Sequence, residues 1–334
     1  MPPNELQLHF FEHLKTIVPA HLSLADELSE LLGLSYDSVY RRLRGEKSID
    51  INELRKICEA YHISLDQVLQ LQNDAVVFRA PGINSNGRPF EEYLRGMLQT
   101  VRHFNSFEKR EMRYFCKDMT FFHYYLFPEI AAFKTFFWMK TILNTPSFAD
   151  VKFSLEKFPF TDSLQLGREI VAEYNKIPSI ELWNYESVNS TMGQLQYYRD
   201  TDLFSTADDL ARVVDSLNLL LEHMRQQAEK GFKFAPGHAD TGQRASLQFY
   251  VNEVVLGNNT ILVELDGVRH SFITYNVLSY LESRDPRFNE KSFSNFNTIV
   301  SRSNLISGTG ERDRSKFFKA LRQKVATLNT STLG

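Results

Sequence analysis

Residues 23–45 read SLADELSELLGLSYDSVYRRLRG and carry the start and stop signals of two short helices. Ser23 and Ser35 are of a type that favours the N-cap position, where a side-chain hydroxyl accepts a hydrogen bond from a backbone N–H. Gly33 follows the first apolar run and Gly45 follows the second, and glycine readily adopts the left-handed conformation that ends a helix. The stretch therefore predicts two helices joined by a tight turn.

The spacing of apolar residues indicates how these two helices pack. Leu24, Leu28, Leu31 and Leu32 form one face of the first helix. Val39 and Leu43 form the buried stripe of the second helix, and Leu34 fills the angle between the two. At about 100° per residue, the other side chains of the second helix include a set that shares one arc of about 140° beside this stripe. The members of that arc are Tyr36, Asp37, Tyr40, Arg41 and Arg44.

The stretch resembles the helix-turn-helix of the lambda-repressor class, also called the XRE or Cro/C1 family. The matching features are Leu28, the turn Leu32-Gly33-Leu34-Ser35, Val39, Arg41 and Gly45. The resemblance covers about residues 5–70 and implies a DNA-binding domain of five short helices. Two positions depart from the family: Ser29 stands where Ala is usual, and Leu24 stands where a Gln often touches the DNA backbone.

If the second helix is a recognition helix, its N-terminal part enters the major groove. Arg41 is then the first choice for a base contact, because a guanidinium can bond guanine O6 and N7 together. Asp37 accepts from cytosine N4 or holds Arg41 four residues on. Tyr36 and Tyr40 contact thymine methyls or phosphates. Arg42, Arg44 and Lys47 are read as phosphate contacts, which position a protein without specifying sequence. The predicted DNA-binding residues are Ser35, Tyr36, Asp37, Tyr40, Arg41, Arg42, Arg44 and Lys47.

Further short helices flank this pair. One is predicted from Glu5 to Val18, a fourth begins at Asp50 or Asn52, and a fifth begins near Ser64. Gly, Pro, Asn and Ser cluster at residues 80–89, which is the clearest linker in the chain. We therefore expect a DNA-binding domain over residues 1–75, a linker over 76–89 and a larger domain over 90–334.

The larger domain is expected to be α+β and mainly helical. Helical patterns occur at 90–108, 128–143, 163–176, 187–199, 206–230, 276–283, 290–303 and 312–328. Around residue 245 the period changes to two, which predicts strands at 247–251, 260–265 and 268–275, with 111–116 as a possible fourth. The dipeptide Asp266-Gly267 is a strong sequence signal for a two-residue hairpin turn. The fold class is thus multidomain, with a five-helix lambda-repressor-like domain followed by a larger domain that holds a small antiparallel sheet.

Composition and charge set limits on the partners. Lys and Arg total 38 against 41 Asp and Glu, so the net charge is −3, and 43% of residues are hydrophobic, as in ordinary globular proteins. Residues 1–70 hold seven basic and eleven acidic residues, yet four of the seven cations fall within Arg41–Lys47. This distribution predicts few phosphate contacts per subunit and weak binding to non-specific DNA.

The sequence also bears on location. Two cysteines are too few for a disulfide framework and favour a reducing compartment. The N-terminus lacks the basic and apolar regions of a signal peptide. The most apolar stretch, Phe115 to Leu143, is interrupted by charged residues, so no membrane span is expected. We expect a cytoplasmic protein.

Other candidate sites are weaker. His238, in a loop, and His270, in a strand, are the histidines to consider for a ligand, and Cys116 lies near His103 and His123 in sequence. Residues 308–312 form a short glycine loop that could cradle phosphate or simply connect two helices. Seven basic residues between Arg302 and Lys324 read as a solvated face or as auxiliary phosphate contacts. Dense aromatics at 121–138 read first as core and second as the lining of an apolar pocket or dimer interface. No metal or cofactor is predicted.

The sequence as a whole predicts a transcriptional regulator and not an enzyme. Its partners would be double-stranded DNA, a second copy of the chain and an unidentified small-molecule effector of the larger domain. A homodimer is expected because one helix-turn-helix contacts too little DNA to be selective, and the long apolar face at 206–230 is a candidate dimer element as well as candidate core. The alternatives are a protein–protein adaptor and a DNA-targeted enzyme, each using the helix-turn-helix as a docking module.

Overall fold

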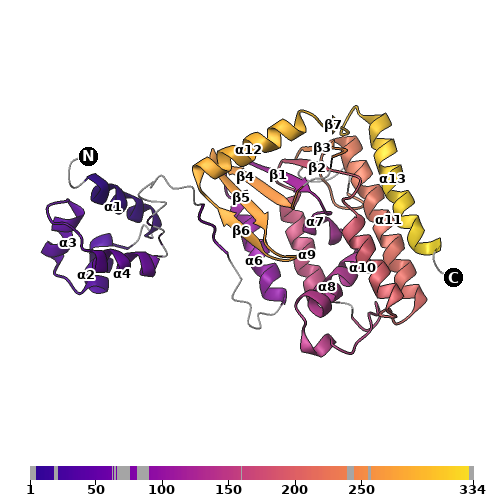
Figure 1. Cartoon of the computed structure of the whole chain (residues 1–334), viewed down its shortest axis with the longest axis horizontal. Coiled ribbons are helices and arrows are strands. Elements are labelled where there is room, and N and C mark those ends of the chain that lie inside the picture. The colour runs from indigo at the N-terminus through magenta and orange to yellow at the C-terminus, as the bar shows by residue number, and fades with distance from the viewer. Residues whose placement is uncertain are drawn as a thin grey trace. The chain divides into compact units, whose positions relative to one another are not determined.

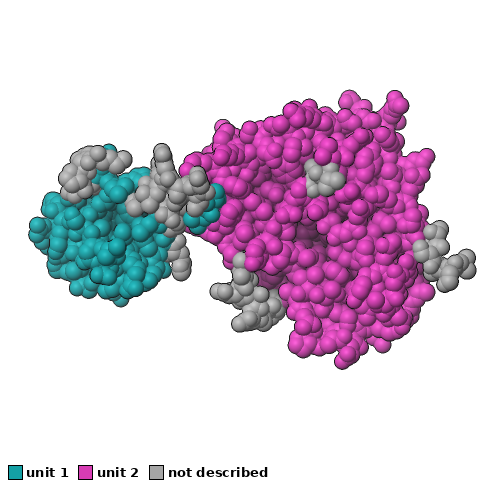
Figure 2. All heavy atoms as spheres, in the orientation of Figure 1, with its two compact units in different colours: residues 1–77 teal, residues 78–334 magenta. Residues whose placement is uncertain are grey.

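The chain divides into two compact units, residues 1–77 and 78–334 (Figure 2). The computed structural model describes residues 5–18, 22–61, 63, 65, 76–80, 90–158, 160–238, 244–254 and 257–330. The boundary between the units falls close to the expected end of the first domain at residue 75. Each unit has its own hydrophobic core.

The described part of the first unit consists of helices joined by turns and loops (Figure 1). Its helices are α1 (Glu5–Ile17), α2 (Leu24–Leu32), α3 (Tyr36–Leu43) and α4 (Ile51–Tyr61). Phe10, Phe11 and Leu14 of α1 are buried together with Leu28 of α2 and Ile57 of α4. The fifth helix expected from near Ser64 lies almost wholly outside the described residues.

The second unit combines a mixed sheet with helices on both of its faces (Figure 1). Its strands are β1 (Arg110–Cys116), β2 (Ser179–Trp183), β3 (Leu247–Val251), β4 (Thr260–Leu265), β5 (Val268–Thr274), β6 (Tyr280–Ser283) and β7 (Asn304–Leu305). Its helices are α6 (Phe90–Asn105), α7 (Phe121–Tyr124), α8 (Pro128–Phe137), α9 (Thr161–Tyr174), α10 (Asn189–Asp200), α11 (Ala207–Lys230), α12 (Pro286–Val300) and α13 (Glu311–Thr330), with a π-helical turn at Trp138–Ile142 and a 3-10 turn at Pro146–Phe148.

The sheet is larger than the sequence predicted, and it is not antiparallel throughout. Seven strands run in the order β6-β5-β4-β1-β2-β3-β7. β1, β2 and β3 are parallel to one another, because the chain crosses back through helices between them, whereas the remaining pairs are antiparallel. Of the expected strands, 260–265, 268–275 and 111–116 lie together as β4, β5 and β1, whereas 247–251 is β3, which β2 separates from β1.

Two elements differ in kind from the prediction. The helix expected at 276–283 is wrong, since residues 280–283 form strand β6 and pair with Ser271–Thr274 of β5. Strand β2 was not expected at all, because Glu181 interrupts its apolar run. β2 pairs with β1 and β3, which are distant in sequence, and β6 pairs with the preceding strand β5. The state of a strand depends on such partners, which the pattern of one segment does not report.

The two faces of the sheet have separate apolar layers. One small layer packs α12 against the sheet through Phe115, Leu182, Leu262, Phe293 and Phe296. The main core lies on the other face, where α11 packs beside α8 and α13 (Figure 1). The apolar face of 206–230 is buried within this core, so it is not available as the dimer element that was considered.

The start of the expected linker belongs to the larger unit. The Arg79 backbone N–H donates to the Glu282 carbonyl at 2.7 Å, and the Glu282 N–H donates back to Arg79 at 2.8 Å. The Phe78 ring packs edge-on against Phe288, with 5.3 Å between ring centroids. Residues 78–80 therefore extend the β6 edge, and the part of the linker at 81–89 lies outside the described residues.

Candidate nucleic-acid interface

The turn between α2 and α3 is built by the residues that predicted it. Ser23 caps α2 by accepting from the Asp26 N–H, and Ser35 caps α3 by accepting from the Ser38 N–H. Gly33 ends α2 in the left-handed region with φ +66°, where a side chain would be strained. Gly45 adopts φ +73° just after α3. These predicted caps are confirmed.

The packing between α2 and α3 fixes the direction of the second helix. Val39 of α3 and Leu28 of α2 are both buried, and Leu34 is half-buried between the helices. The Ser29 hydroxyl donates to the Leu34 carbonyl at 2.6 Å, so a serine at this close contact ties α2 to the turn. The two helices thus form a helix-turn-helix whose second helix has one buried and one exposed face.

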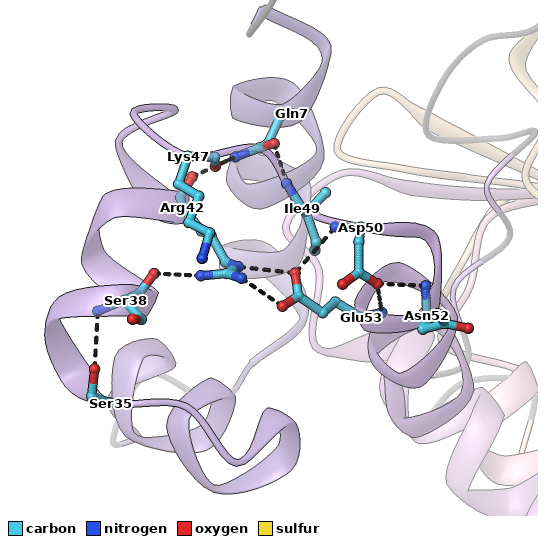
Figure 3. Close-up of polar contacts among 9 residues, drawn as sticks. All are labelled: Gln7, Ser35, Ser38, Arg42, Lys47, Ile49, Asp50, Asn52 and Glu53. Atoms are coloured by element: carbon cyan, nitrogen blue, oxygen red, sulfur yellow. Dashed lines mark hydrogen bonds and ion pairs between the residues drawn. The ribbon is translucent and has the colours of Figure 1, made fainter.

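Arg42 is buried beneath this helix and does not face solvent (Figure 3). The residue is only 4% exposed, and its guanidinium binds the Glu53 carboxylate in a bidentate manner, with Nε–Oε2 at 2.9 Å and Nη2–Oε1 at 2.6 Å. Its remaining Nη1 donates to the Ser38 carbonyl at 3.0 Å. The prediction that Arg42 contacts phosphates is wrong for this structure, because the side chain is committed to joining α3 to α4.

Gln7 of α1 holds the loop that follows α3 (Figure 3). Its amide nitrogen donates to the carbonyls of Arg42 and Lys47 at 2.7 and 2.8 Å. Its amide oxygen accepts from the Ile49 N–H at 2.8 Å. One side chain therefore bonds one backbone group in the last turn of α3 and two in the loop before α4, and it fixes the segment that carries Lys47.

The outward face of α3 presents the aromatic and charged residues of the predicted arc. Tyr36 and Tyr40 are 52% and 47% exposed, although both are large rings. Asp37 is also exposed, and the Tyr36 hydroxyl donates to the Asp26 carboxylate of α2. This carboxylate raises the pKa of Tyr36. Ser35 lies at the start of this face, with its hydroxyl engaged in the helix cap.

The cations of this face are partly neutralised within the unit. The Glu46 carboxylate lies 2.9 Å from Arg44 Nε and 3.9 Å from Arg41 Nε. All three side chains are about half exposed, so these pairs contribute little to stability and can be exchanged for another anion. Lys47 is exposed and forms no ion pair with any described residue. Asp37 makes no ion pair with Arg41 in the described part of the chain.

The other candidate residues are held in internal contacts. Cys116 is buried, and burial raises the pKa of its thiol. His123 contacts Glu181, at 3.1 Å, and not the thiol of Cys116. His270 lies 3.1 Å from Glu282, and the exposed His238 contacts the carbonyl two residues before it. No group of three or more metal-ligating side chains occurs in the described ranges.

The glycine loop at 308–312 is closed by a neighbouring side chain. Buried Arg314 donates to the carbonyls of Ile306 and Gly308 at 2.8 and 3.1 Å. A Cβ at Gly310 would lie 2.5 Å from the Leu305 carbonyl oxygen, so glycine is required there for close backbone packing. The loop is thus a compact connection. Among the other cations of this region, Lys316 and Arg322 face Glu253 and Glu222, which fits a solvated face.

A buried polar cluster on the sheet was not foreseen. Glu181 of β2 is fully buried and accepts from the Tyr174 hydroxyl and from Trp183 Nε1 at 2.8 Å, with His123 beside it. Burial alone would raise the pKa of Glu181, but these partners lower it to about 2. The carboxylate is thus fully satisfied, and the cluster organises the core.

Gln7, Glu46 and Glu53 are the residues around the exposed helix that sequence reasoning missed. Gln7 and Glu53 contact α3 from other helices, and Glu46 contacts it from the loop that follows. These are polar contacts, which an apolar pattern does not encode. Asp50-Ile51-Asn52-Glu53 does carry one usable signal, a helix start followed three residues later by an acid, and Glu53 accepts from the Asp50 N–H at 3.1 Å.

Comparison with known families gives a match over most of the first unit and the first residues of the second. A family model described as the BetR domain matches residues 13–88. The similarity thus spans α2, α3 and α4 and stops just before α6. No curated protein and no solved structure matches the chain. No helix in the described ranges is both long and apolar enough to cross a membrane.

Proposed function

We propose that the chain is a sequence-specific DNA-binding transcriptional regulator whose larger unit senses a ligand or mediates dimerisation. The observation that carries the proposal is the outward face of α3. The buried Arg42–Glu53 pair joins that helix to α4, and Gln7 joins its end to α1. Its outward face exposes Tyr36, Tyr40 and Arg41. A rigid helix with exposed bonding groups suits entry into a major groove.

Arg41 is proposed to read a base, and Arg44 and Lys47 are proposed to bind phosphates. An incoming phosphate would replace Glu46 as the partner of Arg44, at little cost because that ion pair is half exposed. Two phosphate contacts in each of two copies would give a slope of about −3.6 for log K against log salt, at roughly −0.9 per contact. This shallow slope agrees with a unit whose net charge is negative.

The proposal includes a homodimer. A single α3 reaches only a few base pairs, and proteins of this architecture achieve selectivity by placing two recognition helices about 34 Å apart on two half-sites. The apolar face of α11 does not join the two copies, because it lies in the core. Sedimentation of the full-length chain with and without a selected duplex measures the stoichiometry.

A selection from randomised duplexes with the full-length protein tests the proposal. We expect an enriched motif with two half-sites, lost in Arg41→Ala. Arg55→Ala is the matched control, because Arg55 is an exposed arginine of α4 with a similar ion pair, to Glu59 at 3.8 Å. Enrichment of no motif by the wild-type protein refutes the proposal.

One observation favours a second candidate, a protein–protein adaptor. The outward face mixes two tyrosines with Asp37 and Glu46, and tyrosine is enriched in protein interfaces. An adaptor would enrich no duplex, and its complex with a protein partner would be weakened by Tyr40→Ala more than by Lys47→Ala. The duplex selection therefore separates the two candidates.

A further inference from the structure

The larger unit contains a cavity of about 320 Å³ that no described side chain fills. It lies between α6 and the sheet, and aromatic rings from five elements line it: Tyr93 and Phe104 of α6, Tyr114 of β1, Phe121 of α7, Phe272 of β5 and Tyr280 of β6. An apolar cavity of about 150 Å³ is enough to hold benzene, so this one has room for about two fused or linked rings.

The polar groups of the cavity restrict the chemistry of its ligand. The Tyr114 and Tyr280 hydroxyls lie 3.0 Å apart and form a hydrogen-bonded pair in a mainly apolar lining, whose other polar side chains are Tyr93, Thr100, Ser279 and Glu92. Glu92, exposed at the N-terminal part of α6, is the one charged residue among those that line the cavity in the described ranges. The carboxylate, with no cation beside it, disfavours an anionic ligand. A few hydroxyls among many apolar groups suit a mainly apolar ligand with one hydrogen-bonding group.

Gly96 lies on the solvent-exposed side of the cavity, as does Thr100 one turn further along α6. Gly96 lies in the interior of α6, where glycine is unfavourable for a helix, and a Cβ built there would meet nothing within 4 Å. Packing therefore does not require glycine at this position, in contrast to Gly167 of α9, where a Cβ would collide with the Tyr125 ring. The space beside Gly96 belongs to the cavity.

The walls of the cavity are the elements that hold both ends of residues 81–89. On one side, Arg79 pairs with Glu282 of β6, two residues from the cavity residue Tyr280. On the other side, α6 begins at Phe90, whose buried ring contacts the cavity residue Tyr93 with 5.8 Å between centroids. The chain that leads to the helix-turn-helix is therefore attached to β6 through Arg79.

We propose that this cavity binds a small, uncharged, mainly aromatic molecule with one hydrogen-bonding group, and that its occupancy is transmitted through β6 to residues 78–80. This inference deepens the proposed function by naming the class of effector, and its regulatory part rests on that function. The ligand would pack between α6 and β6 and hold them at a fixed separation. The Arg79–Glu282 pairing, which joins the β6 edge to the chain leading out of the unit, would become more stable.

Binding is tested without DNA, by the fluorescence of N-phenyl-1-naphthylamine added to the full-length protein. We expect one saturable site, with at least tenfold weaker binding of the sulfonated analogue 8-anilinonaphthalene-1-sulfonate. Gly96→Leu fills the cavity and should weaken binding of the uncharged probe at least tenfold. Thr100→Phe, one turn further along α6, is a second filling variant. Gly193→Leu is the matched control, because Gly193 is an exposed glycine of α10 with nothing within 4 Å.

The cavity site is overturned if Gly96→Leu and Thr100→Phe bind the probe as tightly as the wild type does. It is also overturned if the control Gly193→Leu loses as much affinity for the probe as Gly96→Leu. Transmission is tested by hydrogen exchange of the Arg79 and Glu282 amides, which should slow at least fivefold when the probe is bound. Unchanged exchange overturns transmission. Since neither measurement uses DNA, failure of duplex selection would refute only the proposed function. Once a duplex has been selected, saturating probe should change the Kd of the protein–duplex complex at least threefold for the wild type and not for Gly96→Leu. An unchanged Kd for the wild type overturns the regulatory role.

Discussion

Replacing Arg42 with alanine separates a structural arginine from a DNA-contacting one. The substitution leaves the Glu53 carboxylate, with a side chain only 13% exposed, without its guanidinium. Breaking a buried ion pair by removing one partner costs about 3–5 kcal/mol. We expect the lower end, about 3 kcal/mol, because Glu53 keeps the Asp50 N–H as a donor. A unit of this size is stabilised by roughly 4–12 kcal/mol in total, so the loss is a large fraction.

The measurement is hydrogen exchange by mass spectrometry on the full-length chain, followed in peptides from α2, α3 and α4. A loss of about 3 kcal/mol accelerates exchange of their most protected amides by roughly 100-fold. Arg44→Ala should accelerate it less than about threefold, because its pair with Glu46 is exposed. Arg42→Met combined with Glu53→Leu should restore most of the protection.

The reasoning fails if Arg42→Ala leaves exchange in α2–α4 within about threefold of the wild type. If the same variant then weakened binding to every duplex, Arg42 would be a phosphate contact, as the sequence suggested.

Three further outcomes are expected. Arg41→Ala should reduce discrimination between a selected duplex and its variants by about 1–3 kcal/mol, whereas Lys47→Ala should weaken all duplexes alike and reduce the salt slope by about 1, as measured by competition titration. Gly310→Ala should destabilise the larger unit by about 1–3 kcal/mol in urea unfolding, since its Cβ would lie 2.5 Å from the Leu305 carbonyl oxygen. The folded-state pKa of Glu181 is about 2, below its ordinary value of 4.5. The larger unit should therefore lose about 3 kcal/mol of stability as the pH falls from about 4.5 toward 2. Urea unfolding at each pH measures this loss, and Glu181→Gln should abolish it.

Each of these outcomes has a control in the chain. Gly193→Ala, at a glycine with open space, should be neutral or stabilise by about 0.5–1 kcal/mol, and destabilisation there would show that the glycine reasoning is unsound. Burial lowers the pKa of His223 to about 4, so it adds a separate loss of stability between about pH 6.5 and 4, which Glu181→Gln should retain. A motif preference altered by Lys47→Ala would contradict its assignment to phosphate.

The helix-turn-helix could be predicted because its signals are local. Ser23, Gly33 and Ser35 act within three or four residues of themselves, and the structure uses each as the sequence indicated. Arg42 could not be placed in the same way. On a helical wheel it lies beside the exposed arc, and only Glu53, eleven residues on in α4, draws it inward. A long side chain at the edge of a buried stripe takes its role from a neighbour that the local pattern does not reveal.

The sheet shows the same limit at greater range. β4 and β5 form a hairpin around Asp266-Gly267, so alternation and turn chemistry were enough to predict them. β2 was missed because Glu181 is tolerated in a buried strand only by virtue of Tyr174 and Trp183. The parallel pairing of β1 with β2 depends on helices that lie between them, and no residue near either strand encodes it.

The central place of β1 in the sheet has a consequence for synthesis of the chain. Arg110 of β1 pairs with Leu265 of β4, about 155 residues later along the chain. At about 5–20 residues per second, the ribosome needs roughly 8–31 s between these two residues, and the first unit can complete its local contacts in that time. Each nascent chain would therefore carry a finished helix-turn-helix while β1 still has an unpaired edge. If the helix-turn-helix binds DNA as proposed, the nascent chain would gain affinity for DNA before it could respond to a ligand. The risk of aggregation would be greatest while the edge of β1 is still unpaired.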